Sequence, residues 1–262
     1  MAASYGNGNI RIWDLFRKQE VISIQAHSEA ILASSALDLH FMASASNREI
    51  LIWDTRNETL VKTLTGHSLF VHHLLKMQNG FLLSASADRT IKVWNSTDWT
   101  LTRTLEGHFD SVKCLAELSY DLVASGSEDG EIRIWDVNKG SHVRRWQAHP
   151  KPIKSLILLP RQKCLASLSI GKEIKIWNFD QGSLVRTLSS NEAFYSLAVL
   201  KNGDLVSGSH NGHIKIWDVE NGWVKKSVFY GPNAIWCLAV NLKGKLAVGM
   251  GDGGIRILNF LY

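Results

Sequence analysis

The sequence predicts an all-β protein built from seven similar units. Two observations carry this prediction: a six-residue motif recurs at nearly constant spacing, and short apolar runs alternate with turn-forming residues. Six copies of the motif end in Trp followed by Asp or Asn, and the seventh ends in Leu258-Asn259. We call the Trp of each motif, or Leu258 in the last, its anchor. The anchors stand at positions 13, 53, 94, 135, 177, 217 and 258, in steps of 40, 41, 41, 42, 40 and 41 residues.

Each complete unit is expected to hold four strands, named a to d in chain order. In the third unit these are 71–77, 81–86, 90–94 and 101–105, with a tight hairpin at 87–89 between b and c. Strand d of this unit, Leu101-Thr-Arg-Thr-Leu105, is one of the short runs that read as strands. All four prolines lie in connections or at strand starts, where no ladder donor is lost. The units end near residues 14, 54, 95, 136, 178, 218 and 259.

Besides the repeated Trp-Asp dipeptides, the sequence contains the Gly-His dipeptides Gly66-His67 and Gly107-His108. With both kinds of dipeptide in this repeat, the chain resembles the WD-repeat family along its whole length. The resemblance implies a seven-bladed β-propeller in which residues 1–262 form a single domain. Stacking of blades around an axis would bury both faces of each sheet. It also implies a network in each blade, with His before strand a, Ser in b, Asp in the b–c turn and Trp in c.

Two units carry this network in full: His67, Ser84, Asp88 and Trp94, and His108, Ser125, Asp129 and Trp135. Ser86 and Ser127 remain alternatives to Ser84 and Ser125. In other units Asn47, Gly171 and Asn211 stand where the Asp is expected. Because the sets recur at one position per blade, they indicate structural networks rather than one catalytic site.

The ends of the sequence predict incomplete first and last blades. Seven units of about 41 residues need about 287, so the chain is about 25 residues short. We expect the first blade to hold c, d and a stub of b, and the last blade to hold a, b and c. The N-terminal strand that closes such rings is then absent, an unpaired edge is left at 255–258, and an N-terminally truncated chain is expected.

Several chemistries are disfavoured, and no catalytic residues, cofactor or metal are predicted. The match Gly249-x-Gly251-x-x-Gly254 precedes a strand, whereas a dinucleotide site needs a helix there. Cys114, Cys164 and Cys237 show no metal-binding or disulfide spacing, and Cys114 and Cys237 are expected to be buried. Without a signal peptide or an apolar run of about 18 residues, a cytoplasmic or nuclear protein that contacts no membrane is expected.

The net charge of +5 does not favour nucleic-acid binding, because the basic residues are spread over the repeats. Six stand two residues before an anchor and seven lie in d strands, together 13 of the 29 Lys and Arg residues. Charged residues on outer strands also discourage edge pairing.

The resemblance to WD-repeat proteins implies that a partner binds at the rim where the d–a and b–c connections emerge, here called the d–a rim. The repeats disagree there, so the fold does not dictate these residues. The candidates are Phe70, His72, Lys113, Glu128, Lys154, Tyr195, His210 and Trp236. Aromatic and basic side chains favour a protein or peptide partner, acidic or phosphorylated. The predicted function is a non-enzymatic scaffold; the alternative is a substrate-receptor or regulatory propeller of a larger ubiquitin ligase or kinase assembly.

Overall fold

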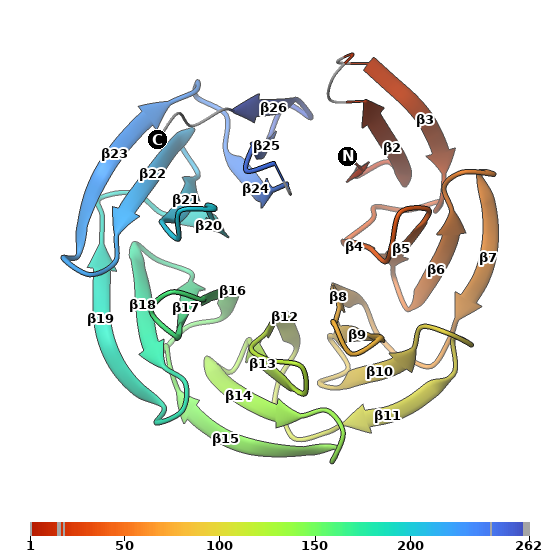
Figure 1. Cartoon of the computed structure of the whole chain (residues 1–262), viewed down its shortest axis with the longest axis horizontal. Coiled ribbons are helices and arrows are strands. Elements are labelled where there is room, and N and C mark those ends of the chain that lie inside the picture. Colours follow the sequence, from red (N-terminus) through yellow and green to blue (C-terminus); the bar gives the residue numbers. More distant parts are fainter. Residues whose placement is uncertain (1, 15–16, 18, 242, 259–262) are drawn as a thin grey trace. The chain divides into compact units, whose positions relative to one another are not determined.

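The computed structural model describes residues 2–14, 17, 19–241 and 243–258 (Figure 1). All regular structure in these residues is β, in seven antiparallel sheets, and the fold is the seven-bladed β-propeller predicted from the repeats. In the described part of the chain, no helix is long and apolar enough to cross a membrane. Two compact units are distinguished: the first comprises 1–123 and 135–142, the second 124–134 and 143–262. That residues 1–262 form a single domain stays a prediction.

The first three sheets belong to the first unit. Sheet 1 holds β1 (Ala2–Ser4), β2 (Asn9–Asp14) and β3 (Gln19–Gln25). Sheet 2 holds β4 (Ala33–Ala36), β5 (Phe41–Ser46), β6 (Glu49–Asp54) and β7 (Thr59–Leu64). Sheet 3 holds β8 (Val71–Lys76), β9 (Phe81–Ser86), β10 (Ile91–Asn95) and β11 (Leu101–Leu105).

Sheet 4 holds β12 (Val112–Glu117), β13 (Leu122–Ser127), β14 (Glu131–Asp136) and β15 (Ser141–Gln147). Its residues are assigned in part to the first unit and in part to the second. The second unit continues with sheet 5, which holds β16 (Ile153–Leu159), β17 (Cys164–Ser169), β18 (Glu173–Asn178) and β19 (Ser183–Ser189). Sheet 6 holds β20 (Phe194–Val199), β21 (Leu205–Ser209), β22 (His213–Asp218) and β23 (Trp223–Phe229). Sheet 7 holds β24 (Ile235–Val240), β25 (Leu246–Met250) and β26 (Ile255–Leu258).

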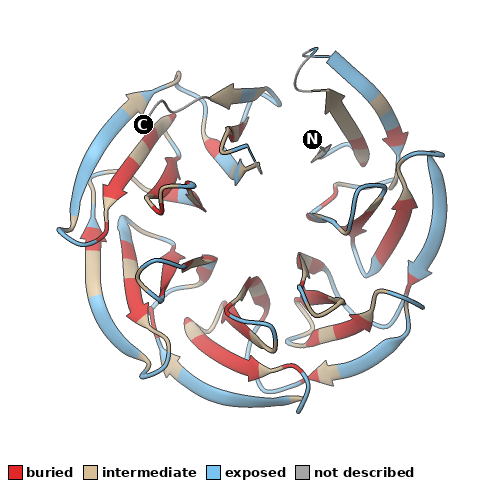
Figure 2. Ribbon diagram, in the orientation of Figure 1, coloured by how far each residue is buried: buried red, intermediate tan, exposed pale blue. Residues whose placement is uncertain are grey.

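Burial within each sheet follows strand position (Figure 2). The b strands are almost wholly buried: every residue of β17 and β21 is buried, and in β5 and β9 every residue but the first is buried. Such strands read as continuous apolar and small-residue runs because neighbours cover both faces. The d strands β7, β11, β15, β19 and β23 are mostly exposed, and they carry the charged side chains expected of edge strands.

The core lies between consecutive sheets. In the first unit, Ile50 and Ile52 of β6 pack with Leu74, Leu82 and Trp94 of sheet 3. In the second unit, Phe194 and Trp217 pack against residues of sheet 5, and their rings meet edge to face at 5.7 Å. Trp94 and Trp217, at equivalent positions of strand c, therefore both contribute to the packing between two sheets.

The expected incomplete blades are confirmed as three-stranded sheets at both ends of the chain. Sheet 1 begins with a three-residue stub and sheet 7 ends at β26. The residues expected after the last anchor, 259–262, lie outside the described part. One expectation was wrong: Cys114 is buried, but Cys237 is exposed, as is Ala239 two residues further along β24. The equivalent residues of β20, Ser196 and Ala198, are buried.

Candidate functional site

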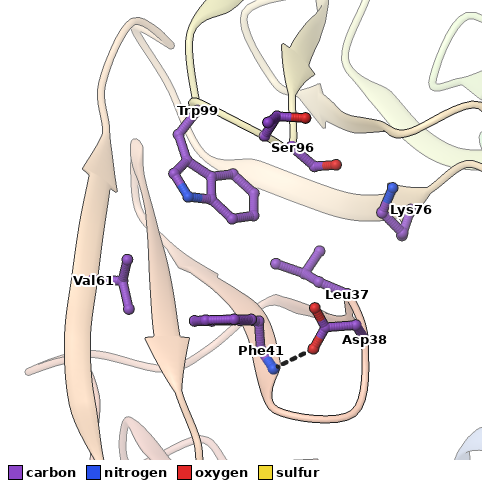
Figure 3. A pocket seen from close by; sticks show the side chains of 8 residues that line it. Leu37, Asp38, Phe41, Val61, Lys76, Ser96 and Trp99 are labelled. Carbon is purple, nitrogen blue, oxygen red and sulfur yellow. Dashed lines mark hydrogen bonds between the residues drawn. The ribbon is translucent and has the colours of Figure 1, made fainter.

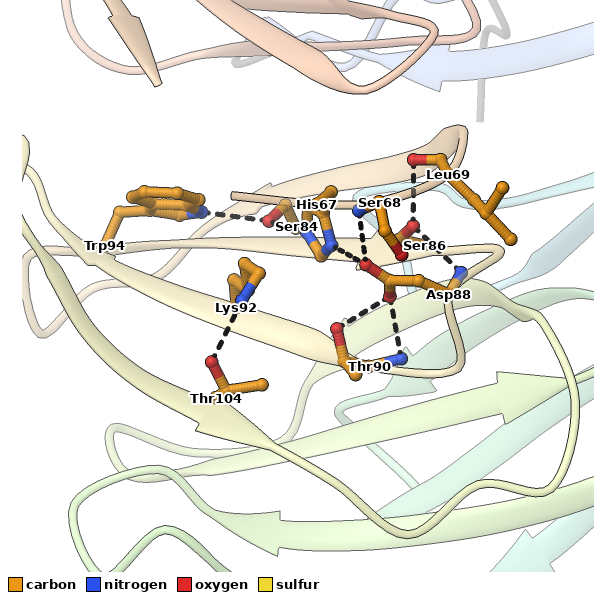
Figure 4. Close-up of polar contacts among 10 residues, drawn as sticks. All are labelled: His67, Ser68, Leu69, Ser84, Ser86, Asp88, Thr90, Lys92, Trp94 and Thr104. Carbon is orange, nitrogen blue, oxygen red and sulfur yellow. Dashed lines mark hydrogen bonds and ion pairs between the residues drawn. The ribbon is translucent and has the colours of Figure 1, made fainter. Parts of the chain in front are cut away.

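The third blade carries a continuous polar network centred on Ser84 (Figure 4). The indole N–H of Trp94 donates to Ser84 Oγ at 2.9 Å, and Ser84 Oγ lies 2.7 Å from His67 Nε2. His67 Nδ1 lies 2.7 Å from Asp88 Oδ2. Ser86, the alternative in the sequence, instead donates to the carbonyl of Leu69 and accepts the amide N–H of Asp88.

Asp88 fixes the orientation of the histidine. Burial alone would raise the pKa of Asp88, but hydrogen bonds from His67 and Thr90 and from the amide of Ser68 hold it well below its usual range. The carboxylate is therefore charged at neutral pH, and it favours a proton on His67 Nδ1. Nε2 of His67 is then free to accept the hydroxyl proton of Ser84.

This network has the order of a Ser-His-Asp triad, but its environment is different from that of a nucleophile. Ser84 is fully buried, and its oxygen already accepts the N–H of Trp94. A catalytic hydroxyl must reach a substrate, so this arrangement joins strands rather than reacts.

Shorter versions of the network occur in the blades that lack the Asp. His27 and Trp53 both contact Ser44 Oγ, at 2.8 and 3.2 Å, and His149 and Trp177 contact Ser167 Oγ at 2.6 and 2.8 Å. Burial lowers the pKa of His27, and burial followed by the charge of Lys175 lowers that of His149 to about 4. Both imidazoles are therefore neutral at pH 7. In the sixth blade only the bond from Trp217 to Ser207 remains, at 2.8 Å.

The fourth blade carries the second predicted set. His108, Ser125 and Trp135 are all buried, and Asp129 is half-buried. The rings of His108 and Trp135 lie 6.0 Å apart.

The basic residues that precede the anchors are bound within their own parts of the fold. Lys175 Nζ donates to the carbonyl of Ala148 at 3.0 Å, and Lys215 Nζ donates to Ser190 Oγ at 2.6 Å, where the other blades have the histidine. Arg133 is buried and paired with Glu131 at 2.7 Å. These three cations therefore make their polar contacts within the protein.

Four of the candidate rim residues lie on β-bulges at the start of strand a. The register between strands a and b shifts around His72, Lys154, Tyr195 and Trp236, so each of these residues is left out of the ladder. A bulge re-aims a side chain and locally ends the regular pairing. The b–c hairpin is tied to the same place, because the amide N–H groups of Ala87, His210 and Gly251 donate to the carbonyls of Phe70, Ala193 and Ala234.

In the first unit this geometry brings together two candidates. Lys113 Nζ lies 2.8 Å from His72 Nε2 and donates to it. The lysine is therefore already engaged with another candidate residue. Phe70 is 46% exposed and follows the network histidine by three residues.

In the second unit three candidates form an aromatic cluster: Tyr195, His210 and Trp236. The rings of Tyr195 and Trp236 are stacked, with centroids 4.8 Å apart and planes within 8°, and Tyr195 meets His210 edge to face at 6.3 Å. Tyr195 is 37% and Trp236 59% exposed. The absence of a side chain at Gly251 leaves room for the indole, since a Cβ there would lie 3.1 Å from Trp236 Nε1.

Lys154 and Glu128 complete the candidates. Lys154 is exposed on β16, which packs beside β20, and it has no ion-pair partner among the described residues. Glu128 is half-buried in the hairpin of the fourth sheet. The structure therefore places one exposed cation and one exposed aromatic stack on neighbouring strands of the second unit.

Comparison with known families finds the repeat described as "WD domain, G-beta repeat" at residues 58–95, 99–136 and 182–218. Each match begins near strand d of one blade and ends with strand c of the next. WD repeats at three positions of a seven-bladed propeller confirm the resemblance seen in the sequence. Propellers of this family are typically non-catalytic and typically bind proteins or peptides. A comparison with curated proteins gave no significant match.

Proposed function

We propose that this chain is a non-enzymatic scaffold that binds an acidic or phosphorylated peptide of a partner protein at the d–a rim of its second unit. The observation that carries the proposal is the exposed Tyr195–Trp236 stack on two bulges, with the unpaired Lys154 on the neighbouring strand. Rigid aromatic groups supply much of the binding energy in protein interfaces. A free ammonium group adds attraction for carboxylate or phosphate.

The stack determines how a partner is held. Because Tyr195 and Trp236 already contact each other, a partner cannot insert between them and must cover their outer edges. A preformed stack loses little conformational entropy on binding, which favours affinity.

Lys175, Lys215 and Arg133, which stand two residues before an anchor, make polar contacts within the protein. This supports a protein partner over nucleic acid. The buried hydroxyl of Ser84 supports a non-catalytic role. A substrate-receptor or regulatory role in a larger ligase or kinase assembly uses the same surface. It is distinguished by co-purification of a partner with that activity.

The proposal is tested with Trp236→Ala and Lys154→Glu in affinity purification of the full chain from cells. Both substitutions should remove the same partners, because both alter the surface that the partner covers. Trp223→Ala is a matched control, since Trp223 is 60% exposed but lies on the outer strand β23. Lys243→Glu, in the a–b connection of sheet 7, is the control for charge.

Recovered partners are then tested as synthetic acidic and phosphorylated peptides by titration at two salt concentrations. Affinity should fall with salt and fall further in Lys154→Glu. If the two variants fold normally and keep every partner, the d–a rim of this unit is not the binding surface.

A further inference from the structure

A pocket of about 210 Å³ lies in the first unit, at the rim opposite the d–a rim (Figure 3). It is formed where the a–b connection of sheet 2 meets the c–d connection of sheet 3. Leu37, Phe41, Val61 and Trp99 give it apolar walls. Asp38 and Lys76 supply its charged groups.

Trp99 has a backbone conformation that its side chain makes unfavourable. Its φ is 63°, in the left-handed region where a bulky residue is an outlier. The equivalent residue, four positions after the one that follows the anchor Trp, is Glu58, Gly140, Gly182 or Gly222 in four other blades, all with positive φ. Trp99 N–H donates to the carbonyl of Asn95 at 2.8 Å, and the three glycines make the same bond at the same length.

The turn therefore gains nothing from tryptophan, and glycine would satisfy it without strain. Strained residues that persist tend to cluster at functional sites. Part of the indole packs on the core between sheets 2 and 3, and the rest lines the pocket opposite Phe41 and Leu37 (Figure 3). The side chain, rather than the turn, accounts for the residue.

The polar groups of the pocket limit what it can bind. Asp38 Oδ1 accepts the amide N–H groups of His40 and Phe41 at 2.7 and 2.9 Å, while Oδ2 accepts no hydrogen bond from any described residue. Lys76 Nζ makes only a long bond of 3.3 Å to the carbonyl of Met77. One carboxylate and one ammonium group offset each other, so an ionic ligand would lose its hydration without a net opposite charge.

The size of the pocket limits the ligand further. Its volume is below the roughly 300–1,000 Å³ typical of small-molecule and cofactor sites. It suits one large side chain, and the indole and phenyl walls favour an aromatic ring.

We propose that this pocket binds a tyrosine side chain presented by a partner protein, with the ring between Trp99 and Phe41 and the phenol O–H donated to Asp38 Oδ2. The pocket lies in a different unit and at a different rim from the surface proposed above, so neither proposal depends on the other.

The test uses the full chain and three blocked amino acids: N-acetyl-tyrosinamide, N-acetyl-phenylalaninamide and N-acetyl-argininamide. Binding is followed by the shift of the Trp99 indole N–H signal, which is assigned by its loss in Trp99→Gly. The tyrosine probe should bind at least about fivefold more tightly than the phenylalanine probe, and the arginine probe should bind most weakly. Asp38→Asn should reduce the preference for tyrosine over phenylalanine.

Trp99→Gly should weaken binding of the tyrosine probe about tenfold or more, measured by ligand-observed NMR. It should still fold, because glycine occupies this turn in three other blades. Glu58→Gly is the matched control: it relieves the same backbone strain in sheet 2 and removes no wall of the pocket, so binding should not change.

Whether the bound tyrosine belongs to a protein segment is tested with the peptide Gly-Gly-Tyr-Gly-Gly. This peptide should bind more tightly than N-acetyl-tyrosinamide. Equal binding would mean that the pocket takes free phenols rather than a protein segment. Equal affinity for all three probes, or an unchanged affinity in Trp99→Gly, would overturn the proposal.

Discussion

Ser84 shows how much of a blade depends on one small side chain. Its hydroxyl contacts the histidine before strand a and the tryptophan of strand c, so it joins three segments that are distant in sequence. Ser86, two residues later on the same strand, points to the connection before strand a and to the hairpin. The two serines are equally buried but differ in what they hold.

We predict that Ser84→Ala lowers the free energy of unfolding by about 2–3 kcal/mol, because it leaves two buried ring nitrogens without partners. Ser86→Ala should cost only about 1 kcal/mol, since the groups it leaves are partly exposed. Urea denaturation of both variants measures the difference. Equal losses would show that the bond to the indole is not special.

The network residues can be recognised in the sequence because they repeat, but the sequence does not distinguish Ser84 from Ser86. They stand two residues apart and therefore lie on the same face of one strand. The choice depends on where the histidine ring lies, which is a tertiary fact. The prediction that Cys237 is buried was wrong for a related reason. Its position in the strand predicts burial, but its exposure depends on what covers β24.

The b–c hairpin has one position with positive φ, which glycine occupies in sheet 4 and arginine occupies in sheet 3. Gly130 has φ of 79°, and a Cβ there would lie 2.1 Å from the carbonyl oxygen of His149. The two amide N–H groups of Ala148 and His149 both donate to the Gly130 carbonyl, so the following connection runs directly over the turn. Arg89 holds the same hairpin position in sheet 3, with φ of 71°.

Gly130→Ala should therefore destabilise the protein by at least about 2 kcal/mol, from left-handed strain together with a backbone clash that no side-chain rotation relieves. Arg89→Gly should be neutral or stabilise by up to about 1 kcal/mol, because it removes the strain alone. Thermal and urea unfolding of the two variants test this contrast. A destabilised Arg89→Gly would mean that the arginine side chain has a structural role that outweighs the strain.

The strands themselves could be predicted from the sequence, but the bulges that shape the candidate site could not. Alternation gives strand a in each blade, yet nothing in Phe194-Tyr195-Ser196 shows that Tyr195 leaves the ladder. The stacking of Tyr195 on Trp236 follows from two such bulges on neighbouring strands. The pocket at the opposite rim was missed, although one sequence signal existed: Trp99 stands where three other units have glycine.

For the molecule as a whole, the repeat predicts seven sheets, of which the first and the last are short, because each anchor implies one blade. It does not predict the division into two compact units, which depends on contacts between blades. Both units contain buried histidines. Burial lowers the pKa of His73 in the first unit and of His149 in the second to about 4.

These histidines make stability depend on pH. A histidine whose pKa is lower in the folded chain than in the unfolded chain disfavours folding as protons are added, so stability is present above about pH 6.5 and is lost as pH falls towards 4. For His149 alone, the loss between pH 7.5 and pH 5 is about 2 kcal/mol. His73, and Asp88 at still lower pH, should act in the same direction, because the folded chain also lowers the pKa of that carboxyl.

His149→Gln should separate this contribution from the rest. Glutamine can still form a hydrogen bond with Ser167 but does not titrate, so the variant should lose less unfolding free energy than the wild type between pH 7.5 and pH 5. Trp223→Phe is the control, because Trp223 is exposed and the substitution neither adds nor removes a titratable group, so the pH slope should not change. Urea denaturation at the two pH values gives both slopes. If His149→Gln kept the full slope, the neutral buried imidazole of His149 could not be a cause of acid instability.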